Sequence, residues 1–204
     1  MNKKTRKPKS MSKYNEIRGF LSAASLRFQE HKSKIAQHIS LALADDLKLN
    51  QSGILEAAPL NVSFHDFLLT KQTDLVSCLR ECSGSISWRE AGFGKLPKEF
   101  SKRIFVSELI GPNGLFDSTH IRIGLLIMHE QMAYPKHWHD AEELYLVLNG
   151  NAYWSVDDGP DVLYPPDSFV HHKSCQPHSM TTQAEPLLAL WGWTGNIDGK
   201  SYSV

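Results

Sequence analysis

The residues best suited to chemistry lie between His137 and Gly150, where two histidines and a glutamate stand at the spacing of metal ligands. We expect this segment to form one strand, in which His137 and His139 point the same way and Glu143 shares a face with Tyr145. Two imidazoles and one carboxylate leave a divalent ion with open positions for water or substrate. The segment therefore predicts a metal site suited to Lewis-acid chemistry, followed by a turn at Gly150.

The spacing of these residues carries the prediction. A lone histidine near a strand is usually a satisfied polar group. The order His-x-His, three residues, Glu, six residues and Gly resembles the first sequence motif of the cupins, here His137, His139, Glu143 and Gly150. One position departs from that motif, because Gln131 stands where a glycine usually precedes the first histidine by six residues. The departure concerns the turn that enters the motif and leaves the ligands in place.

Composition places the chain among ordinary globular proteins. With 204 residues, 41% of them hydrophobic, it can form one large or two small domains with a real core. Its 22 Lys and Arg balance 22 Asp and Glu, so no overall charge attracts it to nucleic acid or to a membrane surface. The cysteines Cys78, Cys82 and Cys175 include no CxxC pair, which suits a reducing compartment. Without a signal-peptide core or a long apolar run, we expect a cytoplasmic protein with no membrane span.

Three regions follow one another along the chain. Residues 1–13 hold six Lys or Arg and no acidic residue, and we expect a disordered basic tail there. Residues 14–83 form a predicted α-helical extension, because apolar residues recur at intervals of three and four up to about Leu49 and a further helix is expected from about Ser63 to Cys82. Residues 84–204 form the predicted barrel that carries the metal site.

The barrel prediction depends on short apolar runs separated by turn residues. These runs are residues 103–110, 121–129, 143–148, 152–156, 161–164 and 187–193. An antiparallel barrel or jelly roll accounts for their rhythm, and the mouth of such a barrel would give a metal a concave place with little water. The expected fold is mainly β: a cupin barrel, that is, a double-stranded β-helix, with an α-helical N-terminal extension.

A third histidine is needed to complete the ligand set, and the later strands offer His171, His172 and His178. Generic cupin spacing, with Pro166-x-Ser168 in place of the second motif's Pro-x-Gly and a histidine three residues later, favours His171. The spacing alone does not decide among the three.

A narrower resemblance bears on this choice. The chain resembles the cupin dimethylsulfoniopropionate lyases, especially the DddQ type, from about Arg103 to Trp193. The matching segments are Tyr134-Pro-x-His137-x-His139-x-Ala-Glu-Glu143-x-Tyr145, Tyr164-Pro-Pro, and His171-His172-x-Ser174-x-Gln176-Pro177-His178-x-Met180. The resemblance implies that the third imidazole is His178, so that the metal ligands are His137, His139, Glu143 and His178.

The resemblance also implies an activity, the cleavage of dimethylsulfoniopropionate into dimethyl sulfide and acrylate by β-elimination. That reaction needs a base for the proton next to the carboxylate, a Lewis acid on the carboxylate and a pocket for a sulfonium cation. Tyr145 corresponds to the family's candidate base, and Tyr134 to a second tyrosine that anchors substrate or assists proton transfer. Since aromatic rings attract cations that have no hydrogen to donate, Trp191 and Trp193 are candidates for the sulfonium.

Several alternatives stay open at the level of sequence. The chain could be another metal cupin, such as a dioxygenase or an isomerase, a paralogue without lyase activity, or a small-molecule sensor. Three nitrogens and a carboxylate suit one divalent transition metal, with zinc, iron and manganese as the first candidates and no decisive preference among them. The expected partner is a small-molecule sulfonium substrate, not a nucleic acid or a membrane, and the oligomeric state is open.

Overall fold

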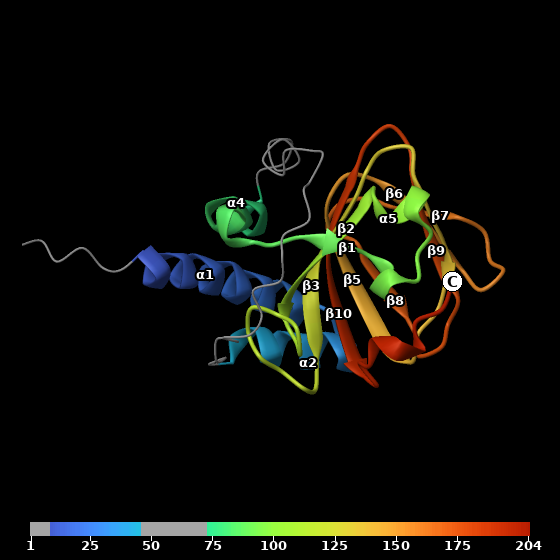
Figure 1. Ribbon diagram of the computed structural model, residues 1–204. Coiled ribbons are helices and arrows are strands. Elements are labelled where there is room, and N and C mark those ends of the chain that lie inside the picture. The colour runs from blue at the N-terminus through green and yellow to red at the C-terminus, as the bar shows by residue number, and fades with distance from the viewer. Residues whose placement is uncertain (1–8, 46–72) are drawn as a thin grey trace, which may run out of the picture.

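Two antiparallel β-sheets face each other in the computed structural model of the chain, which describes residues 9–45 and 73–204. The larger sheet has the strand order β1-β2-β3-β10-β5-β8, and the smaller one β4-β9-β6-β7 (Figure 1). This arrangement, with helices before it, confirms the expected cupin fold. The strands are β1 Arg89–Glu90, β2 Ile104–Ile110, β3 Arg122–Met128, β4 Ala133–His137, β5 Ala141–Asn149, β6 Ala152–Val156, β7 Val162–Tyr164, β8 Phe169–His172, β9 His178–Thr182 and β10 Leu187–Gly195.

The larger sheet is covered on both faces. Every residue of β2 and β3 is buried, and so are all but one residue of β5 and of β10. A strand that is buried on both faces has no solvent side, so its sequence reads as a continuous apolar run instead of alternating polar and apolar residues. This explains why residues 103–110, 121–129 and 187–193 stand out so clearly in the sequence.

Helices supply the outer cover of that sheet. They are α1 Lys9–Gln29, α2 Lys34–Ala44 and α4 Asp74–Cys82, with the short α5 Lys98–Ser101 elsewhere on the barrel (Figure 1). The hydroxyls of Ser33 and Thr73 cap the first turns of α2 and α4 by accepting backbone N–H groups. Within residues 9–45 and 73–204, no helix combines the length and the apolar composition that crossing a bilayer requires.

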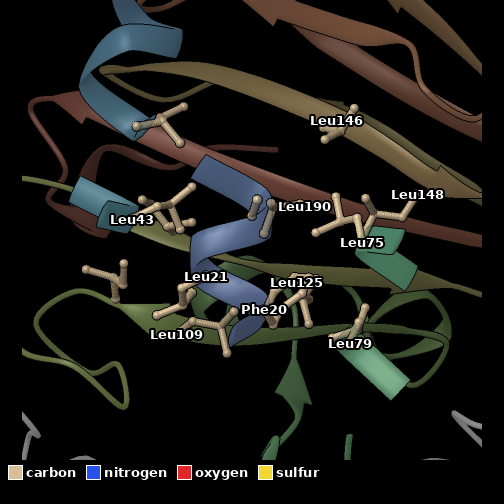
Figure 2. Close-up of a cluster of buried hydrophobic side chains, with 14 of the residues drawn as sticks. Phe20, Leu21, Leu43, Leu75, Leu79, Leu109, Leu125, Leu146, Leu148 and Leu190 are labelled. Atoms are coloured by element: carbon tan, nitrogen blue, oxygen red, sulfur yellow. The ribbon is translucent and has the colours of Figure 1, made fainter. Parts of the chain in front are cut away.

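Helices and sheet share one hydrophobic core. Figure 2 shows its side chains, which come from all three N-terminal helices and from β2, β3, β5 and β10: Phe20, Leu21, Leu43, Leu75, Leu79, Leu109, Leu125, Leu146, Leu148 and Leu190. A second core lies between the two sheets and includes Tyr134, Tyr145, Trp191 and Trp193. The helical layer therefore stabilises the outer face of the larger sheet and leaves the inner face free to form a site.

The helix boundaries differ in part from the predicted regions. Helix α1 begins at Lys9, so the end of the predicted 1–13 tail is helical, while residues 1–8 lie outside the described part of the chain. The predicted start of a helix near Ser63 also lies outside it, and within the described residues α4 begins at Asp74, directly after its N-cap Thr73. The 14–83 and 84–204 division stays a prediction.

The expectation of a single strand from His137 to Gly150 is wrong. Strand β4 ends at His137 in the smaller sheet, and β5 begins at Ala141 in the larger one. The chain crosses between the sheets at Trp138 to Asp140, where Trp138 and Ser203 form an isolated antiparallel bridge. The crossing places the ligand candidates around the barrel interior instead of along one line.

Two backbone positions agree with the motif reading. Gln131, at the place of the usual cupin glycine, has a φ of 50°, in the left-handed region that glycine adopts most easily. Gly150 has a φ of 77°, and a Cβ there would overlap the carbonyl oxygen of Pro186. The predicted turn at Gly150 is confirmed, and Gln131 keeps the turn conformation without the glycine.

Gly124 offers a test of this packing. It lies opposite Trp191 in the β3–β10 pair, and a Cβ there would overlap the carbonyl oxygen of Ser107 and approach Trp191 Cζ2 to 2.7 Å. Because backbone cannot move aside easily, we predict that Gly124→Ala lowers the free energy of unfolding in urea by roughly 1–3 kcal/mol. The control is Gly19→Ala on the exposed face of α1, which has open space and should be stabilising. Equal urea midpoints for Gly124→Ala and the parent would contradict the packing.

Candidate metal centre

The larger sheet presents a row of four polar or aromatic side chains on its inner face. Strand pairing sets Arg122 of β3 opposite Trp193 of β10, Trp193 opposite Glu143 of β5, and Glu143 opposite His172 of β8. Residues directly opposite each other on neighbouring strands share a face, so the four lie side by side. On the smaller sheet, His137 of β4 is paired with His178 of β9. The two sheets therefore bring their histidines and a carboxylate together.

His139, Glu143 and His178 form the centre of this cluster. One ligand atom from each lies within 4.8 Å of the others, and all three residues are buried. The Nε2 atoms of His139 and His178 are each 3.3 Å from Glu143 Oε2. Two imidazole nitrogens and a carboxylate oxygen at this mutual distance are the donor set of a divalent transition-metal site.

The other ring nitrogen of each imidazole is anchored to the backbone. In His137, Nδ1 lies 2.8 Å from the carbonyl oxygen of Pro135. In His139, Nδ1 lies 3.0 Å from the carbonyl oxygen of Ala141. In His178, Nδ1 lies 2.8 Å from the carbonyl oxygen of Gln176. When Nδ1–H donates to a carbonyl, the lone pair is on Nε2, as in histidines that bind metals. In the part of the chain that the structure describes, His178 Nε2 is buried without a hydrogen-bond partner. The donor set therefore fits a metal ion in both composition and orientation.

His137 lies at the side of this group. Its ring centroid is 4.2 Å from that of His178 and 6.3 Å from that of His139, and it is outside the three-residue cluster. Its ring also stacks on Tyr134, with centroids 4.2 Å apart. Burial and the nearby His178 hold the pKa of His137 well below its ordinary value. A neutral imidazole is the form that can bind a metal.

The adjacent His171 and His172 face opposite ways, because side chains alternate along β8. His171 points outward and its Nε2 lies 2.8 Å from Glu142 Oε1 on the surface. His172 points inward, is fully buried and stacks on His178 with centroids 3.8 Å apart. His171, the histidine that generic cupin spacing favours, therefore points away from the His139, Glu143 and His178 cluster. His172 is one of the three sequence candidates for the third ligand and is not the one chosen, although strand parity together with its pairing to Glu143 places it beside the cluster.

Glu143 is the carboxylate on which the cluster converges. Trp193 Nε1 donates to its Oε1 over 2.6 Å, and His172 Nδ1 lies 3.4 Å from its Oε2. Burial alone would raise the pKa of Glu143, but the hydrogen bonds and charges of the surrounding histidines, His139 first, outweigh it and hold this pKa well below its usual value. The carboxylate is therefore ionised and available as a ligand, while burial lowers the pKa of His172 to about 4.

A pocket opens over this cluster. Tyr134, Tyr145, Trp191 and Trp193 line it, together with ligand candidates His137, His139 and Glu143, so it holds every predicted site residue except His178. Its wall also includes three polar or aromatic residues that the sequence did not single out: Arg89, Phe93 and Tyr202.

The pocket tyrosines lie in a low-dielectric setting. Burial, and then the Glu143 carboxylate, raise the pKa of Tyr145 well above its ordinary value. Burial, and then the neighbouring Tyr202, raise the pKa of Tyr134, whose hydroxyl accepts a hydrogen bond from Tyr202 Oη at 3.0 Å. Both phenols are neutral in the absence of a compensating cation, and a divalent ion near Glu143 would oppose the second influence on Tyr145.

Comparison with known proteins gives a family match and a curated relative. A family model described as dimethylsulfoniopropionate lyase matches residues 31–189. The dimethylsulfoniopropionate lyase DddQ of Ruegeria pomeroyi is 33% identical over 112 residues, so the alignment spans 54% of this chain and about half, 56%, of that protein.

Solved structures agree over more of the chain. The crystal structure of DMSP lyase DddQ from Ruegeria pomeroyi DSS-3 covers 88% of this chain and 93% of its own, with a TM-score of 0.66 and 25% identity. A structure described with the DMSP lyases RdDddP and RnDddQII covers 94% of this chain and 98% of its own, with a TM-score of 0.72 and 24% identity. The second of these supports the fold.

A substitution pair tests the choice of the third imidazole. We predict that His178→Ala removes most bound metal, because it deletes a nitrogen of the buried cluster, while His171→Ala keeps the metal, since that ring faces solvent. Metal content is measured by elemental analysis of protein reconstituted with one divalent ion, after circular dichroism has confirmed folding. The reverse pattern, with metal lost from His171→Ala and kept by His178→Ala, would refute the ligand choice.

Proposed function

This chain belongs to the dimethylsulfoniopropionate lyase family, and we propose that it is a metal-dependent lyase that cleaves dimethylsulfoniopropionate into dimethyl sulfide and acrylate. The observation that carries the proposal is the buried cluster of His139, Glu143 and His178 beneath a pocket lined by tyrosine and tryptophan. An elimination of this type needs a carboxylate site, a base and a place for the sulfonium, and the pocket contains candidates for each.

The proposed metal ligands are His137, His139, Glu143 and His178. All three histidines have Nδ1 held by a backbone carbonyl, which leaves Nε2 for a metal. A divalent ion bound there would act as a Lewis acid that withdraws charge from the substrate carboxylate and so acidifies the neighbouring C–H bond. The donor set suits zinc, iron or manganese.

Tyr145 is the proposed base. It is two residues after Glu143 on β5 and therefore shares its inward face, and its hydroxyl is buried in the pocket. As phenolate, Tyr145 would take the proton from the carbon next to the carboxylate. The electron pair of that C–H bond becomes the double bond of acrylate, the carbon–sulfur bond breaks, and sulfur leaves with its electrons as dimethyl sulfide.

Tyr134 is the proposed second tyrosine of the reaction. Its ring is fixed by stacking on His137, and its hydroxyl is held by Tyr202. This anchoring suits a residue that orients substrate, because a side chain that is already fixed loses little further conformational entropy when substrate binds. Tyr202 takes part in the proposal by positioning that hydroxyl.

The sulfonium is proposed to lie against tryptophan. Trp191 faces the pocket opposite Tyr145, and its buried Nε1 has no hydrogen-bond partner among the described residues, so within that part of the chain the ring is held by packing. Trp193 also lines the pocket, but its N–H is engaged by Glu143 and its ring lies 4.1 Å from that of His139. We therefore propose Trp191 as the main sulfonium contact and Trp193 chiefly as a support for the ligands.

The activity is tested with metal-reconstituted protein and dimethylsulfoniopropionate. We expect dimethyl sulfide in the gas phase and an equal amount of acrylate in solution. Failure to release dimethyl sulfide at any metal loading would contradict the lyase and would favour another cupin reaction or a binding role.

The Tyr145→Phe variant tests the base. It keeps the ring and its packing, so metal content and stability should match the parent, while the turnover number falls by the roughly 10²–10⁴-fold expected for loss of a general base. Tyr134→Phe is the companion variant. The contrary result is that Tyr145→Phe raises only KM while Tyr134→Phe abolishes the exchange of the α proton with deuterated water. In that case Tyr134 is the base and Tyr145 orients the substrate.

A further inference from the structure

Three charged side chains meet on the inner face of the larger sheet beside the pocket. Glu108 of β2 accepts a hydrogen bond from Arg122 Nη1 of β3 at 2.7 Å, and Arg89 Nη2 of β1 lies 3.6 Å from the same Glu108 oxygen. The other Glu108 oxygen accepts the backbone N–H of Asn113. The Glu108 side chain is fully buried and that of Arg122 nearly so, while Arg89 is 21% exposed.

This group carries an excess positive charge. Two guanidinium groups share one carboxylate, which leaves a net charge of about +1. Arg122 takes the short contact and also donates Nε–H to the Ile197 carbonyl oxygen at 2.8 Å. Burial lowers the pKa of Arg89, with Glu108 opposing this effect and Arg122 adding to it. Arg89 is the less compensated of the two cations.

Arg89 faces the catalytic pocket. It is paired with Val106 across β1 and β2, and both residues line that pocket. A guanidinium has five N–H donors. Within residues 9–45 and 73–204, the Arg89 side chain donates one hydrogen bond, from Nη1 to the Glu90 carbonyl oxygen at 3.3 Å. Donors of a partly buried, undercompensated cation thus remain available to a ligand in the pocket.

Phe93 holds this guanidinium in place. The Phe93 ring lies 5.1 Å from Arg89 Cζ and 5.5 Å from Arg122 Cζ, within the range of cation–π attraction. Phe93 has a φ of 52° between Gly92 and Gly94, which also have positive φ. A phenylalanine in this backbone region is strained, and such strain persists where surrounding contacts enforce it. The loop therefore fixes an aromatic ring, and through it a cation, at the pocket wall.

We propose that the Arg89 guanidinium binds the carboxylate of the substrate and selects carboxylate-bearing molecules over neutral or purely cationic ones. The inference deepens the proposed function and rests on it for the identity of the substrate. A carboxylate matches the guanidinium in geometry and would neutralise the excess charge of the Arg89, Glu108 and Arg122 group. The pocket's own carboxylate, Glu143, is held by histidines and Trp193.

The test compares the binding of two ligands, neither of which is the sulfonium substrate, so that affinity is measured without turnover. Acrylate and its neutral isostere acrylamide are titrated into metal-reconstituted protein, and the variants are Arg89→Gln and Arg89→Lys. Arg27→Gln, an arginine of α1 that pairs with Glu30, is the control outside the pocket. We expect Arg89→Gln to weaken acrylate binding by about 10- to 100-fold, the loss typical of a charge-assisted hydrogen bond. Acrylamide binding should change less than about 2-fold. The acrylate affinity of Arg89→Lys should lie between those of Arg89→Gln and the parent.

The same variants are also assayed with the sulfonium substrate. Arg89→Gln should raise KM by a factor similar to its loss of acrylate affinity, with kcat changed far less, and metal content should match the parent. Equal losses for acrylate and acrylamide, or no loss for either, would overturn the role of Arg89. If the parent protein releases no dimethyl sulfide but acrylate binding depends on Arg89, the proposed function fails and the carboxylate site stands. Should Arg89→Gln not fold, the charge-preserving Arg89→Lys decides by the ratio of acrylate to acrylamide affinity.

Discussion

Burial of the Glu143 carboxylate is the constraint on which the rest of the site depends. Only 2% of this residue is exposed, and an ionised carboxylate taken out of water costs several kcal/mol unless it is paired and hydrogen-bonded. Trp193 Nε1–H donates to the carboxylate and His172 Nδ1 lies 3.4 Å from it. The Nε2 lone pairs of His139 and His178 face it at 3.3 Å, where a bound divalent ion would compensate its charge. These residues come from β8, β9, β10 and the crossing between the sheets. Strand pairing must therefore be exact, because a shift of one residue would turn these side chains to the other face.

The helical layer and the site are linked through the larger sheet. The helices cover its outer face with apolar side chains, so its strands need no solvent side, and the polar residues of these strands can be concentrated on the inner face around one pocket. The inner face carries two charged groups: the carboxylate cluster around Glu143 and the cationic group around Arg89. Trp193 stands between them in the row, paired with Glu143 on one side and Arg122 on the other. A substrate with a carboxylate and a sulfonium would meet ligand, cation and aromatic ring within a single pocket.

Local spacing in the sequence accounts for much of this arrangement. The His-x-His and Glu143 spacing and the apolar runs of the buried strands all lie within short segments. The change of sheet after His137 could not be predicted, because no glycine or proline marks Trp138 to Asp140. Arg89, Phe93 and Tyr202 could not be found either, since they reach the pocket from distant segments; Tyr202 meets Tyr134 across 68 residues. Only tertiary pairing brings such residues together.

Stepwise metal reconstitution tests the central claim most directly. Protein stripped of metal with a chelator is titrated with one divalent ion while dimethyl sulfide release is followed. If the buried cluster holds one ion that the reaction requires, activity starts near zero, rises in proportion to added metal and saturates at about one equivalent per chain. Full activity in the stripped protein, or saturation that shows no relation to the metal bound, would contradict the account.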